Sequence, residues 1–195
     1  MANKDAAFGF KPVRHLSGGE LRTEEYGIAS GYNPAGSENL YTGSVIELVA
    51  GGTIEAAAAG DTQQGGVFGG CFYTDPTTSK PTYSAYYPKG TAAADIVAYV
   101  YADPNIVFEA QHDGTATLAN NQHANHDFVG VAGSTTTGQS TSEIDTSTYS
   151  TTASGGFRQI GNSKDPDNNT LGSANSNAYV IFNTGEHAYK LITGL

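Results

Sequence analysis

The chain has 195 residues, which suits one domain, and its formal net charge of -10 at pH 7 opposes direct binding to nucleic acid or to anionic lipid. Only 38% of the residues are hydrophobic and 14% are charged, against roughly 45–50% and 25% in ordinary globular domains. Glycine and small polar residues fill the difference. This composition predicts a turn-rich β-protein with a thin core, ordered in part against another copy or a partner surface.

Residues 1–42 are predicted to form an extended, irregular arm, because no helical or strand period persists there and Gly27, Gly31 and Pro34 oppose a helix. The arm is slightly basic and contains apolar residues that a flexible linker would not need. Its candidate partner-binding residues are Phe8, Phe10, Lys11, Val13, Arg14 and Leu16. Such an arm can lie across a neighbouring subunit, and the alternative is a strap packed on its own domain.

Residues 43–195 are predicted to form a single β-domain. Residues 44–49 and 54–59 are typical of a hairpin around a tight turn. Residues 65–73 form the next expected strand, in which internal glycines indicate a bulge or a close backbone approach. The alanines of 54–59 do not predict a helix, because glycines bound the run too closely.

The centre of the expected core is residues 96–101 followed by 106–110, both rich in β-branched and aromatic residues. Pro104 lies between them and cannot donate to a sheet ladder, so the chain must turn or leave the pairing there. The first run is apolar on both faces, as in a central strand. The second is expected to have one wet face, which carries Glu109 and Gln111.

Long loops are predicted at 74–94, 112–126 and 133–156. The first loop contains Tyr83, Tyr86 and Tyr87, which form a candidate interface because tyrosine is enriched in protein contacts. Further strands are expected at 127–132, 155–161, 178–183 and 189–192. Seven or eight short strands without a long helix predict an all-β barrel or sandwich.

His123 and His126, with His112 upstream, are candidate metal ligands. Their spacing directs both rings to one side only on a helix, and this segment is not helical in pattern. A solvated polar loop is therefore the favoured interpretation, and no metal site is predicted.

Residues 165–176 begin like a calcium-binding loop, but the sixth and twelfth positions are Thr170 and Ser176 rather than glycine and glutamate. A simple turn is favoured. The lone cysteine, Cys71, is expected to be buried as a small hydrophobic residue. Because no catalytic motif is present, we expect neither enzymatic activity nor a cofactor.

Four stretches carry a resemblance to a known family: AAFGFKPVRHLSGG at 6–19, EYGIASGYNP at 25–34, AYVYADPNIVFEAQ at 98–111 and GSTTTG at 133–138. Together they resemble the capsid decoration, or cement, proteins of tailed bacteriophages. The resemblance implies a small β-domain, made in the bacterial cytoplasm, that binds the outside of an icosahedral capsid. It also implies a homotrimer whose partner is the major capsid protein.

On this resemblance the apolar arm residues are anchors, and Lys11 and Arg14 pair with capsid carboxylates. We expect removal of residues 1–20 to abolish capsid binding while the β-domain stays folded. The alternative is a phage head fibre or a receptor- or carbohydrate-binding β-module, which the tyrosines of 83–87 and the many hydroxyl and amide side chains favour.

Overall fold

The computed structural model describes residues 2–32, 39–61, 63–117, 122–130, 132–183 and 187–190. Within these ranges the chain forms fourteen β-strands and one 3-10 helix. The strands are β1 Lys11–His15, β2 Glu24–Ile28, β3 Leu40–Tyr41, β4 Val45–Val49, β5 Thr53–Ala56, β6 Gln64–Thr74, β7 Pro81–Ser84, β8 Tyr86–Tyr87, β9 Val97–Tyr101, β10 Ile106–Gln111, β11 Asn125–Val129, β12 Glu143–Ser150, β13 Phe157–Asn162 and β14 Asn177–Phe182, and the helix is η1 Ala188–Lys190. No described helix is long and apolar enough to span a membrane.

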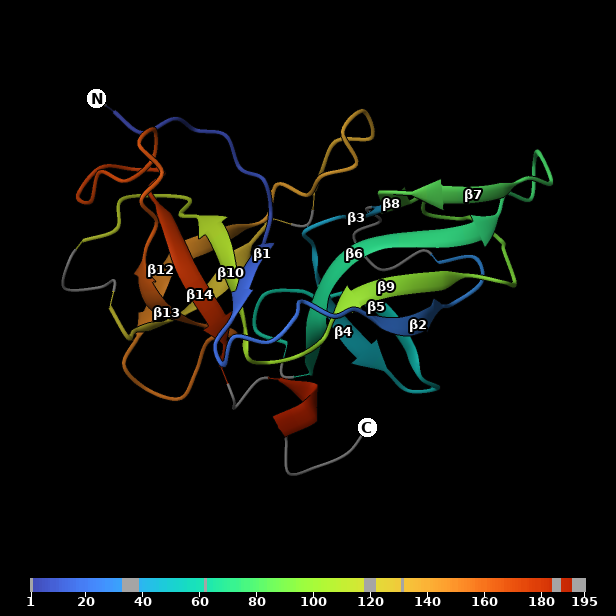
Figure 1. Ribbon diagram of the computed structural model, residues 1–195, viewed down its shortest axis with the longest axis horizontal. Helices are drawn as coiled ribbons and strands as arrows, with labels where there is room; N and C mark the ends of the chain where they lie inside the picture. Colours follow the sequence, from blue (N-terminus) through green and yellow to red (C-terminus); the bar gives the residue numbers. More distant parts are fainter. Residues whose placement is uncertain are drawn as a thin grey trace.

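The strands form two lobes that lie side by side (Figure 1). The first lobe is an antiparallel sheet of order β1-β10-β14-β13-β11-β12. The second has the order β4-β5-β2-β9-β6-β7, and an additional pairing of β4 with β6 closes five of its strands into a barrel. β7 remains outside the barrel as an edge strand. The predicted all-β architecture is confirmed.

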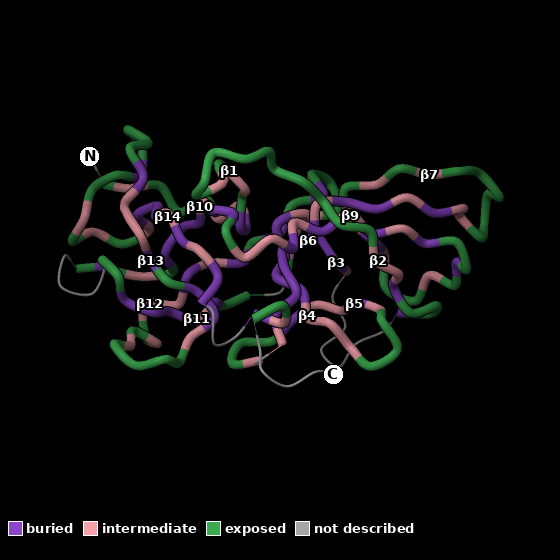
Figure 2. Tube along the Cα trace, turned by 60° about the horizontal axis from the view of Figure 1, so that its bottom comes forward, coloured by how far each residue is buried: buried purple, intermediate pink, exposed green. Residues whose placement is uncertain are grey.

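The hydrophobic core has two parts, one in each lobe. The barrel encloses a cluster that includes Phe68, Tyr87 and Val100, all fully buried. The core of the first lobe contains the five phenylalanines Phe10, Phe108, Phe128, Phe157 and Phe182. Val45 and Val67, which come from barrel strands, pack against these phenylalanines, so the core of the first lobe includes barrel residues where the two lobes meet (Figure 2).

The expected break at Pro104 is confirmed, because β9 belongs to the barrel and β10 to the other sheet. β9 is a central strand between β2 and β6. The expected wet face of 106–110 is wrong: Val107 and Gln111 are buried, and only Glu109 is partly accessible. Gln111 can be buried there because its amide oxygen accepts from the Ala6 N–H and its amide nitrogen donates to the carbonyls of Lys4 and Asn175.

The hairpin predicted over 44–59 is present as antiparallel β4 and β5. β6 follows as predicted and has a register shift between Phe68 and Gly70 opposite β9. β13 and β14 confirm the strands expected near 155–161 and 178–183.

The three predicted loops are partly wrong. Residues 74–94 contain the strands β7 and β8, residues 133–156 contain β12, and β11 begins inside 112–126. β12 is an edge strand in which half of the residues are serine or threonine, so it lacks the apolar alternation that marks a buried strand, and it pairs with β11 only. The last expected strand is also wrong where it is described, because Tyr189 and Lys190 lie in η1; residues 191 and 192, like 118–121 and 131, fall outside the described ranges.

The irregular arm is a further correction. β1 pairs with β10, β2 pairs with both β9 and β5, and β3 pairs with β8, so residues 1–42 supply strands to both lobes. The pairing of β1 has a register shift next to Pro12, which an edge strand tolerates because proline needs no ladder partner there. The boundary at residue 42 is therefore not a boundary of the fold.

Candidate binding surfaces

Phe10 lies in the core rather than on the surface. Its side chain is fully buried, and its ring stacks on Phe157 with centroids 4.3 Å apart and an interplanar angle of 13°. Phe8 and Val13 are half-buried. The proposed role of Phe10 as an anchor for another subunit is thus corrected: it anchors the N-terminal segment to its own domain.

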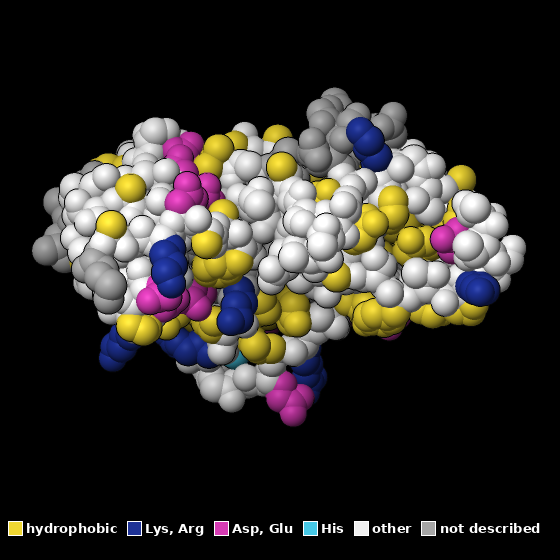
Figure 3. All heavy atoms as spheres, turned by 90° about the horizontal axis from the view of Figure 1, so that it is seen from above, with side chains coloured by type: hydrophobic (Ala, Val, Ile, Leu, Met, Phe, Trp, Pro, Cys, Tyr) yellow, Lys and Arg dark blue, Asp and Glu magenta, His cyan; other side chains and the backbone are white. Residues whose placement is uncertain are grey.

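Three of the predicted arm residues do reach solvent. Lys11 and Arg14 are exposed on β1, and Leu16, directly after it, is 47% exposed. β1 pairs with β10 on one side only, so within the described chain it is an edge of the first sheet. In Figure 3 most of the visible Lys and Arg side chains lie towards the lower margin of the molecule, with hydrophobic side chains and some Asp and Glu side chains between them.

The residues before β1 are held by a clamp of buried amides. Gln111 accepts a hydrogen bond from the Ala6 N–H at 2.9 Å and donates to the Lys4 carbonyl, also at 2.9 Å. Asn168 accepts from the Lys4 N–H at 3.2 Å and donates to the same carbonyl at 2.8 Å. Asn3 donates to the carbonyls of Thr170 and Ala174. The start of the chain is therefore fixed by sequence-distant partners.

A cleft of about 330 Å³ lies where the N-terminal segment passes between the lobes. Its walls include Phe8, Phe68 and Tyr101, and its charged groups are Lys11, Glu109 and Asp165. Lys11 and Glu109 are direct neighbours across β1 and β10, and Glu109 accepts a hydrogen bond from the Ser163 hydroxyl. The mixed charges select no ligand class.

The tyrosines of residues 83–87 do not form one surface. Tyr87 is fully buried, and its hydroxyl donates to the Thr91 carbonyl at 2.9 Å. Tyr86 is half-buried and stacks on Tyr41. Tyr83 alone is freely accessible, with 72% of its surface exposed.

Tyr83 instead belongs to the outer face of the barrel. Phe72 pairs with Tyr83 on β7 and with Val97 on β9, so these three side chains form one row across the sheet. Tyr99, two residues from Val97 on the same side, stacks on Tyr83 with centroids 5.6 Å apart. We call Phe72, Tyr83, Val97 and Tyr99 the tyrosine face. Burial, followed by the neighbouring Tyr83 and Glu25, raises the pKa of Tyr99.

Sequence reasoning missed Phe72, Val97 and Tyr99 as surface residues, because β9 looked apolar on both sides. The feature of the sequence that could have indicated this face was the pair Gly69 and Gly70 on β6. A Cβ at Gly69 would lie 2.9 Å from the Tyr101 ring, and Gly70 pairs with Tyr99, so β6 places no side chain opposite the Tyr99 ring.

The histidines do not form a metal site. His123 is exposed, whereas His112 and His126 are buried with ring centroids 6.1 Å apart. His112 is held by the Ser176 carbonyl at 2.8 Å and by Gln159 at 3.1 Å, and burial lowers its pKa. The described residues contain no group of three or more His, Cys, Asp or Glu that could hold a metal ion.

Asp165 and Cys71 have structural environments. Asp165 accepts from the Asp167 N–H at 3.0 Å, as in a turn. Cys71 is a fully buried free thiol, and burial raises its pKa to about 12, so it is protonated at neutral pH.

Comparison with protein-family models, with curated proteins and with solved structures found no match to this chain.

Proposed function

We propose that this chain is a structural virion protein that binds the outer surface of an icosahedral phage capsid and joins neighbouring capsomers. Its partner is the major capsid protein, and it acts as a homotrimer without enzymatic activity. The observation that carries this proposal is β1, a firmly held edge strand that exposes two cations and, at its end, a leucine.

β1 is suited to a protein contact because it is both rigid and unpaired on one side. Phe10 and the amide clamp fix it, so little conformational entropy is lost when a partner binds. An edge strand can accept a strand of another protein through its free backbone groups. Lys11 lies opposite Glu109, so Arg14 supplies the net positive charge of this edge, and on a chain whose net charge is -10 this favours an acidic partner surface.

Three of the four stretches that carry the resemblance to capsid decoration proteins are adjacent in space. β1, from residues 6–19, pairs with β10, from 98–111. β2, from residues 25–34, pairs with β9, from the same central stretch. These residues set the pairing in both lobes, so the resemblance concerns the architecture, and this supports a shared structural role.

The test is co-sedimentation of the purified chain with empty capsids assembled from the major capsid protein of the same phage. The wild-type chain should bind stoichiometrically, and the double variant Lys11→Glu, Arg14→Glu should lose at least about tenfold in affinity. Lys80→Glu, an exposed reversal at the turn between β6 and β7 of the other lobe, is the matched control. Wild-type chain that stays in the supernatant, or a double variant that binds equally well, would overturn the proposal.

Removal of residues 1–20 is not a suitable test of capsid binding by β1, and point variants are used instead. Removing residues 1–20 would take away β1 and the fully buried Phe10, so we now expect the first lobe to unfold. Loss of capsid binding by the truncated chain would then say nothing about β1 as a contact surface.

A further inference from the structure

The end of β1 brings a serine, a histidine and an aspartate into one chain of hydrogen bonds. The Ser17 hydroxyl oxygen lies 2.9 Å from Nδ1 of His15, and Nε2 of the same ring lies 3.0 Å from a carboxylate oxygen of Asp103. Asp103 precedes β10, whose Ile106 pairs with His15, so strand pairing holds the aspartate beside the ring. A nucleophile, a base and an orienting carboxylate in this order are the groups that activate a serine.

The hydrogen bonds fix which nitrogen of the His15 ring carries the proton. The Ser17 backbone N–H also donates to Nδ1, at 3.2 Å, which requires that this nitrogen carry no proton. The Ser17 hydroxyl is therefore the donor in its own contact with Nδ1, and the ring proton lies on Nε2, which donates it to Asp103. The lone pair of Nδ1 thus faces the hydroxyl proton that a general base would remove.

Asp103 is held so that it keeps the ring in this tautomer. One of its carboxylate oxygens accepts from the Asn105 backbone N–H at 2.8 Å and from the Asn105 side-chain amide at 3.0 Å, and the other faces His15. Burial raises the pKa of Asp103, but the hydrogen bonds from Asn105 and His15 outweigh it and lower the pKa overall, so the carboxylate is ionised at neutral pH. The His15 side chain is itself largely enclosed, with 12% of its surface exposed.

The serine is accessible although its base is enclosed. Ser17 is exposed in a turn that the Gly18 N–H closes by donating to the His15 carbonyl at 3.1 Å. Gly19 lies against the ring, and a Cβ there would lie 3.5 Å from Nδ1, so glycine keeps the space beside the base open. A cavity of about 350 Å³ has His15 and Gly19 in its wall. A small molecule therefore has room beside the contact between the serine and the histidine.

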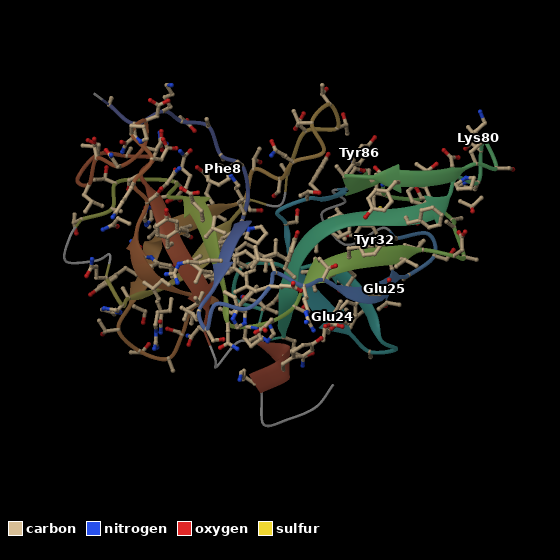
Figure 4. The ribbon with its side chains drawn as sticks, in the orientation of Figure 1. Phe8, Glu24, Glu25, Tyr32, Lys80 and Tyr86 are labelled. Carbon is tan, nitrogen blue, oxygen red and sulfur yellow. The ribbon has the colours of Figure 1, made fainter. Side chains whose placement is uncertain are left out.

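The charges of this cavity favour an uncharged molecule. Among the described residues of its wall, Glu20, Glu24 and Asp103 are acidic and Arg22 is basic, and Arg22 lies 3.8 Å from Glu20. The excess of carboxylates would repel an anionic molecule. Figure 4 shows Glu24 near the middle of the molecule, where the chain from β1 reaches the barrel.

We propose that Ser17 is a nucleophile, with His15 as its general base and Asp103 as the residue that positions this base, and that it accepts an acyl group from small, uncharged, activated esters or thioesters. Its Oγ forms a bond to the acyl carbon, and the bond between this carbon and the activated oxygen or sulfur breaks. The hydroxyl proton passes to Nδ1 of His15 and from there to the departing group.

The product is an ester of an ordinary alcohol, which is much harder to cleave than the activated donor. Each chain is therefore modified once and does not turn over. The modification site does not rest on the proposed capsid function.

The test is incubation of the full chain with p-nitrophenyl acetate at neutral pH, followed by peptide mapping by mass spectrometry. Ser17 should carry one acetyl group as an ester, which neutral hydroxylamine removes, whereas acetylated lysines resist hydroxylamine. Ser17→Ala should abolish this ester, and His15→Gln should slow its formation at least about a hundredfold. Ser154 is the matched internal control, because it is exposed and its hydroxyl contacts the hydroxyls of Ser150 and Thr152 instead of a histidine.

Asp103→Asn tests the positioning role with a second readout. An asparagine amide can donate to Nε2, so the ring proton should move to Nδ1, which nitrogen NMR of the His15 ring detects, and acylation should slow in parallel. Circular dichroism checks that each variant is folded. The proposal is overturned if Ser17 carries no ester, if Ser17 and Ser154 are acetylated at equal rates, or if neither His15→Gln nor Asp103→Asn changes the rate.

Discussion

The replacement Phe10→Ala distinguishes most sharply between a free arm and an integral strand. If residues 1–20 served only to reach a neighbouring subunit, truncating one of their side chains would leave the isolated chain equally stable. In the structure Phe10 is fully buried among Phe128 and Phe157, so the same truncation opens a cavity in the core of the first lobe.

The expected loss is large. Replacement of a buried phenylalanine by alanine costs about 3–5 kcal/mol in free energy of unfolding, through lost transfer energy and the cavity left behind. The stacked contact with Phe157, together with the edge contact with Phe128 at 6.3 Å, places Phe10 in the upper part of that range. For a chain of this length such a loss lowers the melting temperature by about 6–20 °C.

The measurement is urea unfolding of the isolated chain, followed by far-UV circular dichroism, with Leu16→Ala as the control. Leu16 is 47% exposed, so its truncation should cost less than about 1 kcal/mol. If Phe10→Ala were as stable as Leu16→Ala, the N-terminal segment would not be docked on its own domain. The original interpretation as a free arm would then return.

Three further variants test the electrostatics and packing. Burial, with Asp61 and Glu55 nearby, raises the pKa of Glu47 to about 7, so folding stability should fall as pH rises from about 4.5 to 7, and Glu47→Gln should remove most of that fall in thermal melts. Burial lowers the pKa of His187 to about 4, so stability should decline by up to about 3 kcal/mol as pH falls from about 6.5 to 4. Urea titrations of His187→Phe should show a smaller decline. Gly66→Ala should cost more than about 2 kcal/mol in urea unfolding, because its Cβ would lie 2.5 Å from a carbonyl oxygen of β9. At Gly18, whose φ is also positive but where nothing lies within 4 Å, alanine should cost about 1 kcal/mol.

The strands that the sequence predicts well are those whose own residues bury them. β4, β6, β9 and β14 contain runs of valine, isoleucine and aromatic residues, and each pairs on both sides with other strands. For these strands hydrophobic pattern and tertiary environment agree, so local reasoning is sufficient. The break at Pro104 is predictable for the same kind of reason, since it depends on the chemistry of one residue.

The strands that the sequence does not predict are stabilised by partners far away in the chain. β1 exists because β10 offers it an edge, and the residues before it are fixed by Gln111 and Asn168, more than 100 positions away. β12 is composed mostly of hydroxyl side chains and is a strand because β11 pairs with it. No window of sequence around either strand contains this information.

The tyrosines show why the candidate surface was only partly predictable. Tyr83, Tyr86 and Tyr87 are neighbours in sequence, yet one is exposed, one is half-buried and one lies in the core, because β7 and β8 belong to different sheets. The neighbours that Tyr83 does have, Phe72 and Tyr99, come from β6 and β9 through strand register. Register depends on the whole barrel, including the bulge at Gly70 that aligns Tyr99 with a bare backbone position. A surface residue can therefore be recognised from its type, but the surface it belongs to follows only from the pairing of the strands.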